Sequence, residues 1–212
     1  MVFVERKVRV NNLKTNKKQG LKLLQKAKIK LKKGLVVEAV KICEQIIESD
    51  QGAHEAILLL ATCSNKMGHY QNALVYAESC ANIVSLDTEV HYELGLAYQG
   101  LDDSQMAMKV FKQCLSMSPG HEAGLKFAGL LLKFGFAGDA IGLYGSIQGY
   151  HKHNPNYYVG LGLALCSVGE ISQAVSTYEK GLALDSSHRA LCSNLLFASH
   201  YMSGFSPQAL FE

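Results

Sequence analysis

Histidines are the residues with the clearest capacity for chemistry, and their spacing argues against a metal or catalytic site. His151 and His153 stand two apart and could chelate a metal ion, but the neighbouring sequence supplies no third ligand. His54, His121 and His188 recur at one constant interval. A regular interval of this kind indicates a repeated architecture, so we predict no metal site.

Other reactive groups also lack the neighbours that catalysis would need. The chain contains no G-x-x-x-x-G-K-[ST] phosphate loop, no G-x-S-x-G nucleophile turn and no H-E-x-x-H zinc motif. Gly160 and Gly162 form a G-x-G, but Leu and Ala surround them, which favours helix packing over nucleotide binding. We predict no catalytic residue, no cofactor and no enzymatic activity for these residues.

Six cysteines are present, without a C-x-x-C pair and without the spacing of zinc ligands. The first residues, from Met1 to Lys7, show no apolar signal core. The sequence therefore predicts reduced thiols, which behave as small apolar side chains, in a cytoplasmic protein.

The net charge of +3 conceals a basic head. Residues 1–33 hold twelve Lys or Arg and one acid, so they carry +11, whereas residues 34–212 carry −8. Such a head can bind nucleic acid or an anionic surface, or it can be a solvated leader before a Lys-rich helix. Phe3 is its only aromatic residue for base stacking, so we favour a solvated leader over residues 1–19.

The elements that must position any site are revealed by a period in the sequence. A glycine, or once Asp102, is followed five residues later by an alanine, and the unit recurs with a period of about 34 residues: Ala39, Ala73, Ala107, Ala140 and Ala174. Twelve residues before each alanine stands another small residue: Ala27, Ala61, Gly95, Ala128 and Gly162. The pattern predicts pairs of amphipathic helices joined by short turns, with small residues where two helices pack closely.

Two segments carry nearly a whole family pattern. Residues 91–119 contain Leu94-Gly95, Tyr98, Ala107, Phe111 and Pro119, and residues 157–185 contain Leu161-Gly162, Gly169, Ala174 and Tyr178. On these residues the chain resembles the tetratricopeptide repeat (TPR) family. The resemblance implies an all-α, right-handed α-solenoid of about five helix-turn-helix units with a C-terminal capping helix. The units are 20–53, 54–87, 88–121, 122–154 and 155–188.

Two segments should depart from regular pairs. Gly142, Gly145 and Gly149 weaken the second helix of the fourth unit, so we expect it to be short or displaced, with 149–154 as a loop. Residues 189–203 are predicted to cap the stack. Ser206-Pro207 then reads as an N-cap and first helical position, so the segment 189–212 should end in the start of a further, truncated helix.

The tail suggests a second family. Residues 188–212, with Ser193-Asn194-Leu195-Leu196-Phe197, Tyr201 and Ser206-Pro207, resemble the junction between repeats and catalytic domain in SPINDLY-like O-linked N-acetylglucosamine transferases. This resemblance implies a substrate-recognition arm of a larger glycosyltransferase, whose nucleotide-sugar site lies outside these residues.

The repeat resemblance also implies where a partner would bind. First helices of the pairs line a concave groove, and their matching positions give a mixed wall: Glu55, Leu58, Thr62, Asn65, Glu89, Tyr92, Leu96, Gln99, Glu122, Leu125, Lys133 and Asn156. Glu55, Glu89 and Glu122 recur at one position, where they could attract a basic partner or stabilise helix N-termini. Leu and Tyr at the fifth positions leave no clamp for a terminal carboxylate. A wall that is apolar in the middle and polar at the edges suits a peptide or protein segment better than a small-molecule substrate, with Tyr92 as the anchor.

We therefore predict a non-catalytic protein–protein interaction scaffold. The glycosyltransferase arm and an anion-binding module acting through residues 1–33 are the two alternatives. Open-ended stacks can also self-associate through their terminal helices, so self-association stays open.

Overall fold

The computed structural model describes residues 19–48, 53–84 and 87–202, and every regular element in these ranges is a helix. The prediction of an all-α fold is confirmed. The chain forms two compact units, Met1–Val110 and Phe111–Glu212, and their boundary falls within helix α6 (Ser104–Met117). No helix in the described ranges is long and apolar enough to cross a bilayer.

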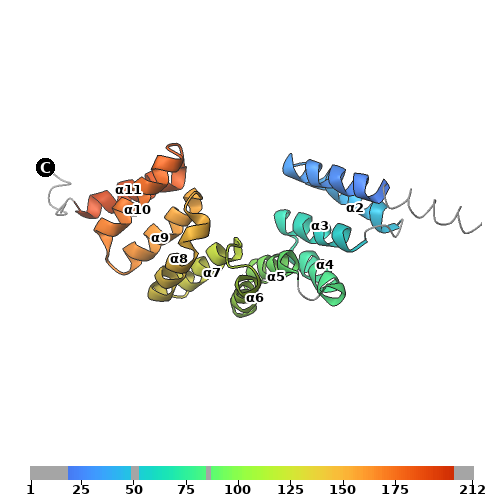
Figure 1. Ribbon diagram of the computed structural model, residues 1–212, viewed down its shortest axis with the longest axis horizontal. Helices are drawn as coiled ribbons and strands as arrows, with labels where there is room; N and C mark the ends of the chain where they lie inside the picture. The colour runs from blue at the N-terminus through green and yellow to red at the C-terminus, as the bar shows by residue number, and fades with distance from the viewer. Residues whose placement is uncertain (1–18, 49–52, 85–86, 203–212) are drawn as a thin grey trace, which may run out of the picture. The chain divides into compact units, whose positions relative to one another are not determined.

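Unit 1 is a stack of helix pairs. A helix over residues 19–32 is followed by four more before α6: α2 (Val36–Glu48), α3 (Ala53–Lys66), α4 (Tyr70–Ile83) and α5 (Thr88–Gly100). α2 packs on α3, α3 on α4 and α4 on α5, and α3 also packs on α5 (Figure 1). The first helices of two successive pairs therefore lie side by side.

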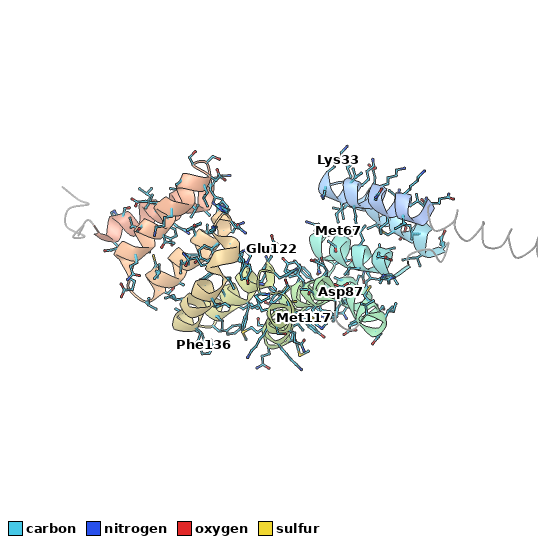
Figure 2. All side chains as sticks on the ribbon, viewed as in Figure 1. Lys33, Met67, Asp87, Met117, Glu122 and Phe136 are labelled. Atoms are coloured by element: carbon cyan, nitrogen blue, oxygen red, sulfur yellow. The ribbon has the colours of Figure 1, made fainter. Side chains whose placement is uncertain are left out.

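Unit 2 repeats this arrangement. After the second half of α6 come α7 (Ala123–Lys133), α8 (Ala137–His151), α9 (Pro155–Ser167), α10 (Ile171–Leu184) and α11 (Arg189–Met202). Here α9 packs on α7, α8 and α10. Its core contains large aromatic side chains, with the Tyr144 and Tyr157 rings 5.6 Å apart edge to face. At the turn between α7 and α8, the exposed Phe136 side chain points away from the helices (Figure 2).

Each pair turns on one residue in the left-handed region, which explains the recurring glycine. In the described ranges the positive φ angles, from 58° to 83°, belong to Gly34, Gly68, Asp102, Gly135 and Gly169. The next residue in each turn donates its backbone N–H to a carbonyl five residues back, as Phe136 does to Leu131 at 2.8 Å. This bond ends the first helix and redirects the chain into the second. Glycine adopts the conformation without strain, and aspartate is among the few residues that tolerate it.

The recurring small residues are the contact points of the helices. The five alanines of the period and the five small residues twelve positions before them are all buried. At Gly162 a Cβ atom would overlap the ring of Tyr178, which lies on the second helix of the same pair. The predicted reason for small residues, close helix packing, is confirmed at this pair.

The prediction for the second helix of the fourth unit is wrong. α8 is continuous over 15 residues, and only Lys152 to Asn154 remain of the expected loop. Its four glycines face open space: Gly138, Gly142, Gly145 and Gly149. The opposite face buries Ala140, Tyr144, Ile147 and His151. Packing of this apolar face supplies the stability that the glycines do not, since tertiary contacts override intrinsic propensity.

At the C-terminal end, α11 occupies most of the segment predicted as a capping helix. The expected helix from Ser206 and the leader up to residue 18 lie outside the described residues.

Candidate functional site

The predicted wall of unit 1 comes from α3 and α5, which lie side by side. α3 supplies Glu55, Leu58, Thr62 and Asn65, and α5 supplies Glu89, Tyr92, Leu96 and Gln99. Each of these eight side chains is half-buried or exposed. All eight side chains are therefore at least partly accessible, and they remain predictions as binding residues.

A polar network links the two helices within this wall. Thr62 Oγ1 donates to Glu93 Oε1 at 2.8 Å, and Asn65 Nδ2 donates to Glu93 Oε2 at 2.7 Å. The same Asn65 amide lies 2.9 Å from the Glu93 backbone carbonyl. Three side chains from two successive pairs are therefore held in fixed orientations, and bidentate contacts of this kind fix geometry as well as adding energy.

Glu93 is nearly inaccessible, with 5% of its surface exposed. Burial raises the pKa of its carboxyl, and the hydrogen bonds from Asn65 and Thr62 offset part of the rise. Glu89 adds a smaller upward effect on that pKa, and Lys66 a smaller downward one. A buried carboxylate needs such donors, because desolvation without partners would cost several kcal/mol, ~2–7 for a neutral polar group alone.

Glu93 was not among the predicted site residues. Its signal in the sequence is the buried stripe of α5, where Val90, Leu94 and Ala97 stand close to it on the same face. A glutamate placed inside such a stripe must be buried and therefore paired.

Charged residues mark both ends of the unit 1 wall. Glu55 lies in the first turn of α3 and Glu89 in the first turn of α5, whereas Lys66 lies in the last turn of α3. Glu55 Oε2 is 3.1 Å from His54 Nδ1. These placements suit the helix dipoles, and they also leave carboxylates at one edge of the wall. The two interpretations of the recurring glutamates therefore both stay open.

The predicted wall of unit 2 is sparser in polar groups. Glu122 is the N-cap residue of α7, and its side chain makes no capping hydrogen bond; Leu125 and Lys133 lie on α7, and Asn156 lies on α9. Leu125 and Lys133 are half-buried or exposed, as are Glu122 and Asn156. The other positions of α9 that correspond to the wall are mainly apolar, and the Leu163 side chain among them is exposed. This part of the wall offers mostly apolar contacts.

The two histidines considered for metal binding do not share a surface. His151 is buried at the end of α8, and His153 is exposed two residues later. In the described ranges no three His, Cys, Asp or Glu residues are grouped so that they could hold a metal ion.

Four of the six cysteines are buried in the helix interfaces: Cys43, Cys63, Cys80 and Cys114. Burial raises the pKa of the Cys43 thiol to about 12 and that of Cys63 to about 11. Both thiols are therefore neutral at physiological pH, and they pack as small apolar groups.

A shallow hollow of about 450 Å³ lies at the turn between α3 and α4. Its lining is Gly68, His69, Tyr70, Gln71, Asn72 and Leu101. The lining contains no carboxylate and one imidazole, so it lacks the paired groups of an acid–base site.

Comparison with known proteins agrees with this architecture. Residues 88–121 match the family model of the tetratricopeptide repeat. The chain has no match among curated proteins.

Several solved structures share the fold. A thermophilic TPR protein of Thermus thermophilus is 17% identical, with 85% of this chain and 99% of that one covered and a TM-score of 0.70. MamA is 20% identical, with 81% and 92% covered and a TM-score of 0.63. YrrB, described as a TPR protein with an unusual peptide-binding site, is 14% identical, with 87% and 95% covered and a TM-score of 0.62. At these identities the likeness shows a TPR fold.

Proposed function

We propose that this TPR stack is a non-catalytic protein–protein interaction scaffold whose inner wall in unit 1 binds an extended segment of a partner. The observation that carries the proposal is the network of Thr62, Asn65 and Glu93, which fixes polar side chains between two half-exposed helices. A wall ordered before binding loses little conformational entropy when a partner arrives. YrrB, which has the same fold, is described as having a peptide-binding site.

The chemistry of the wall indicates the kind of segment. Leu58, Tyr92 and Leu96 provide apolar contact area, and Glu55 and Glu89 lie at the N-terminal edge. An extended peptide with apolar side chains and flanking basic residues would match both features. Tyr92 is the proposed anchor, because aromatic residues contribute a large share of interface energy.

Selection of random peptides on the full chain, followed by fluorescence polarisation, tests this proposal. We expect Tyr92→Ala to weaken the selected peptides about 10- to 50-fold, in line with loss of an aromatic anchor. Glu89→Lys should weaken basic peptides most. Tyr150→Ala is the matched control, since Tyr150 is an exposed tyrosine on α8, outside both walls. Unchanged affinity for Tyr92→Ala and Glu89→Lys would reject the wall.

The alternative of a glycosyltransferase arm rests on the resemblance of residues 188–212, of which 188–202 are described. It proposes the same wall as the substrate-selecting surface of a larger enzyme. The coding sequence after Glu212 tests it directly. A glycosyltransferase domain there would support the arm, and a stop codon directly after Glu212 would reject it.

The anion-binding alternative concerns the basic residues 1–33, of which the helix over residues 19–32 is described. Lys22, Lys26, Lys28 and Lys32 are exposed on it, whereas Lys30 pairs with Glu38 at 2.7 Å. If this face binds single-stranded RNA or anionic vesicles, affinity should fall steeply with salt. Replacing the four exposed lysines with glutamine should abolish the binding. Equal binding by wild type and variant would exclude this face.

A further inference from the structure

The hydrogen bonds between α3 and α5 include one contact more than their donors can supply with protons. Thr62 Oγ1 lies 2.8 Å from Glu93 Oε1 and 3.1 Å from the Leu58 carbonyl oxygen, and a hydroxyl has a single proton to donate. The two protons of Asn65 Nδ2 go to Glu93 Oε2 at 2.7 Å and to the Glu93 backbone carbonyl at 2.9 Å. Three protons therefore face four acceptors while the Glu93 side chain is ionised.

A proton on the Glu93 carboxyl completes this network with every heavy atom in place. When Oε1 carries the proton, it donates to Thr62 Oγ1, and the Thr62 hydroxyl rotates to donate to the Leu58 carbonyl. Oε2 continues to accept from Asn65. The same arrangement therefore fits both charge states of Glu93, so its charge can change without a shift of α3 relative to α5.

Burial is the strongest influence on this carboxyl, and it raises the pKa of Glu93. Among the charged neighbours, Glu89 of α5 acts in the same direction, whereas Lys66 of α3 favours the ionised form. The thiol of Cys63 on α3 also faces the carboxyl. α4 packs on α5 as well, but its Glu78 interacts with a tyrosine of that helix. A further cation near Glu93 would act as Lys66 does and favour loss of the proton.

The predicted wall of unit 1 has a place for such a cation one helical turn away. Glu89 and Glu93 stand four residues apart on α5, so their side chains are neighbours on the helix surface. Glu89 is exposed, whereas Glu93 is buried. A basic side chain that pairs with Glu89 would therefore come close to Glu93 without touching it. Their attraction is weakly screened, because the Glu93 carboxyl is out of water.

We propose that Glu93 makes recognition of a basic side chain by the unit 1 wall dependent on a proton. The partner's cation binds beside Glu89, one proton leaves Glu93 Oε1 for the solvent, and the Thr62 hydroxyl rotates to donate to the carboxylate that remains. This inference rests on the proposed function of the same wall and adds its regulation. A basic segment binds more weakly as the pH falls and Glu93 takes up its proton, whereas a neutral segment lacks this dependence.

The affinity of the full chain for two synthetic peptides, measured between pH 7 and pH 5, tests the proposal. One peptide alternates leucine and arginine, and the other has glutamine in place of each arginine. Over this range we expect wild type to lose on the order of tenfold more affinity for the arginine peptide than Glu93→Gln loses, a typical coupling between two sites. Both proteins should bind the glutamine peptide with the same pH dependence.

Glu93→Gln is the informative variant, because glutamine reproduces the hydrogen bonds of the neutral acid. Its carboxamide oxygen can accept from Asn65, and its amino group can donate to Thr62. Glu170→Gln makes the same chemical change at an exposed side chain of unit 2 and should behave as wild type. Circular dichroism verifies that each variant stays folded.

NMR of the full chain with isotopically labelled glutamate follows the proton directly. The Glu93 carboxyl signal is identified by its absence in Glu93→Gln. It should titrate at lower pH with the arginine peptide bound than in the free chain, because binding and proton release are reciprocal. The glutamine peptide should leave the titration unaltered.

The outcomes separate this inference from the function on which it rests. Equal pH dependence of arginine-peptide binding in wild type and Glu93→Gln would overturn the proton link and leave the wall as a binding surface. So would a Glu93 titration that does not respond to a saturating amount of the arginine peptide. Absence of binding by either peptide, or binding unaffected by Tyr92→Ala, would reject the wall and this inference together.

Discussion

At corresponding positions, the first helices of unit 1 carry hydrogen-bonded polar residues and those of unit 2 carry small or apolar residues. In unit 1, Thr62 and Asn65 of α3 bond to Glu93 of α5. Two periods later the corresponding positions in unit 2 are Gly129, Leu132 and Gly160. A polar link between first helices in unit 1 is therefore replaced by small and apolar residues in unit 2.

Aromatic packing takes over in unit 2. A Cβ atom at Gly160 would overlap the Tyr144 hydroxyl, so a tyrosine from α8 occupies the space at the place of Glu93. Tyr157 packs edge to face on both Tyr144 and Tyr158. The comparison teaches that the turn residues and the small contact residues specify the stack, and that the wall between them is free to vary.

The largest expected effect is at the aromatic contacts of unit 2. Gly162→Ala should lower the free energy of unfolding by about 2 kcal/mol, because the buried Tyr178 ring cannot yield to the new methyl group. Urea unfolding measures it. Gly142→Ala is the matched control: its surroundings are open, so it should raise that free energy by about 0.5–1 kcal/mol. Effects of the same sign at both glycines would contradict the packing described for unit 2.

The polar link of unit 1 should be nearly as sensitive. Glu93→Ala removes the acceptor of two donors and should lower the free energy of unfolding by about 2 kcal/mol. Lys126→Ala, at the same place in α7, changes an exposed side chain and should stay within about 0.5 kcal/mol. If thermal and urea unfolding find the two variants equally stable, the network contributes nothing to holding α3 on α5.

The same carboxyl should give unit 1 a pH dependence. Burial raises the pKa of Glu93 above 4.5 in the folded state, so between that value and the raised one the folded chain binds more protons than the unfolded chain. The contribution of Glu93 to stability therefore grows as pH falls through this window and is lost as pH rises.

Unfolding free energies of wild type and Glu93→Gln, measured from pH 7 down to pH 5, test this sign. We expect the difference between them to shift in favour of wild type as pH falls. Glu170→Gln is the control, because it makes the same chemical change at an exposed side chain outside the link between α3 and α5. A shift in favour of Glu93→Gln at low pH would refute the burial effect.

The smallest effect concerns the turn that distinguishes unit 1. Asp102→Gly should raise the free energy of unfolding by about 0.5 kcal/mol, since glycine adopts a positive φ without strain. Gly169→Ala at the matching turn of unit 2 should lower it by about 1 kcal/mol. A loss of stability on Asp102→Gly would show that the aspartate side chain contributes more than its backbone strain costs.

Much of the fold could be predicted because the period depends on local requirements. A left-handed turn residue and a small contact residue are visible in the sequence at Gly135 and Ala140 without any knowledge of the rest of the chain. The prediction of a short helix at α8 fails because intrinsic propensity does not indicate which face of a helix its glycines occupy. The four positions lie on one side of the helix, away from its packed face.

The candidate site could be predicted only in part. Wall positions follow from the register, so Thr62 and Asn65 were identified as wall residues. Their link to Glu93 depends on how two helices far apart in the sequence are placed, and a single sequence does not specify that. The same limit applies to α11. The exposure of its apolar side chains Leu196, Phe197 and Tyr201 cannot be predicted from the sequence alone.

Photo-crosslinking to a selected peptide tests the central claim, that the predicted wall of unit 1 binds a segment of a partner. A benzophenone side chain replaces Tyr92 on α5 in one variant and the exposed Val75 on α4 in another. The account predicts crosslinks from position 92 and none from position 75. Crosslinks from position 75 alone would contradict it.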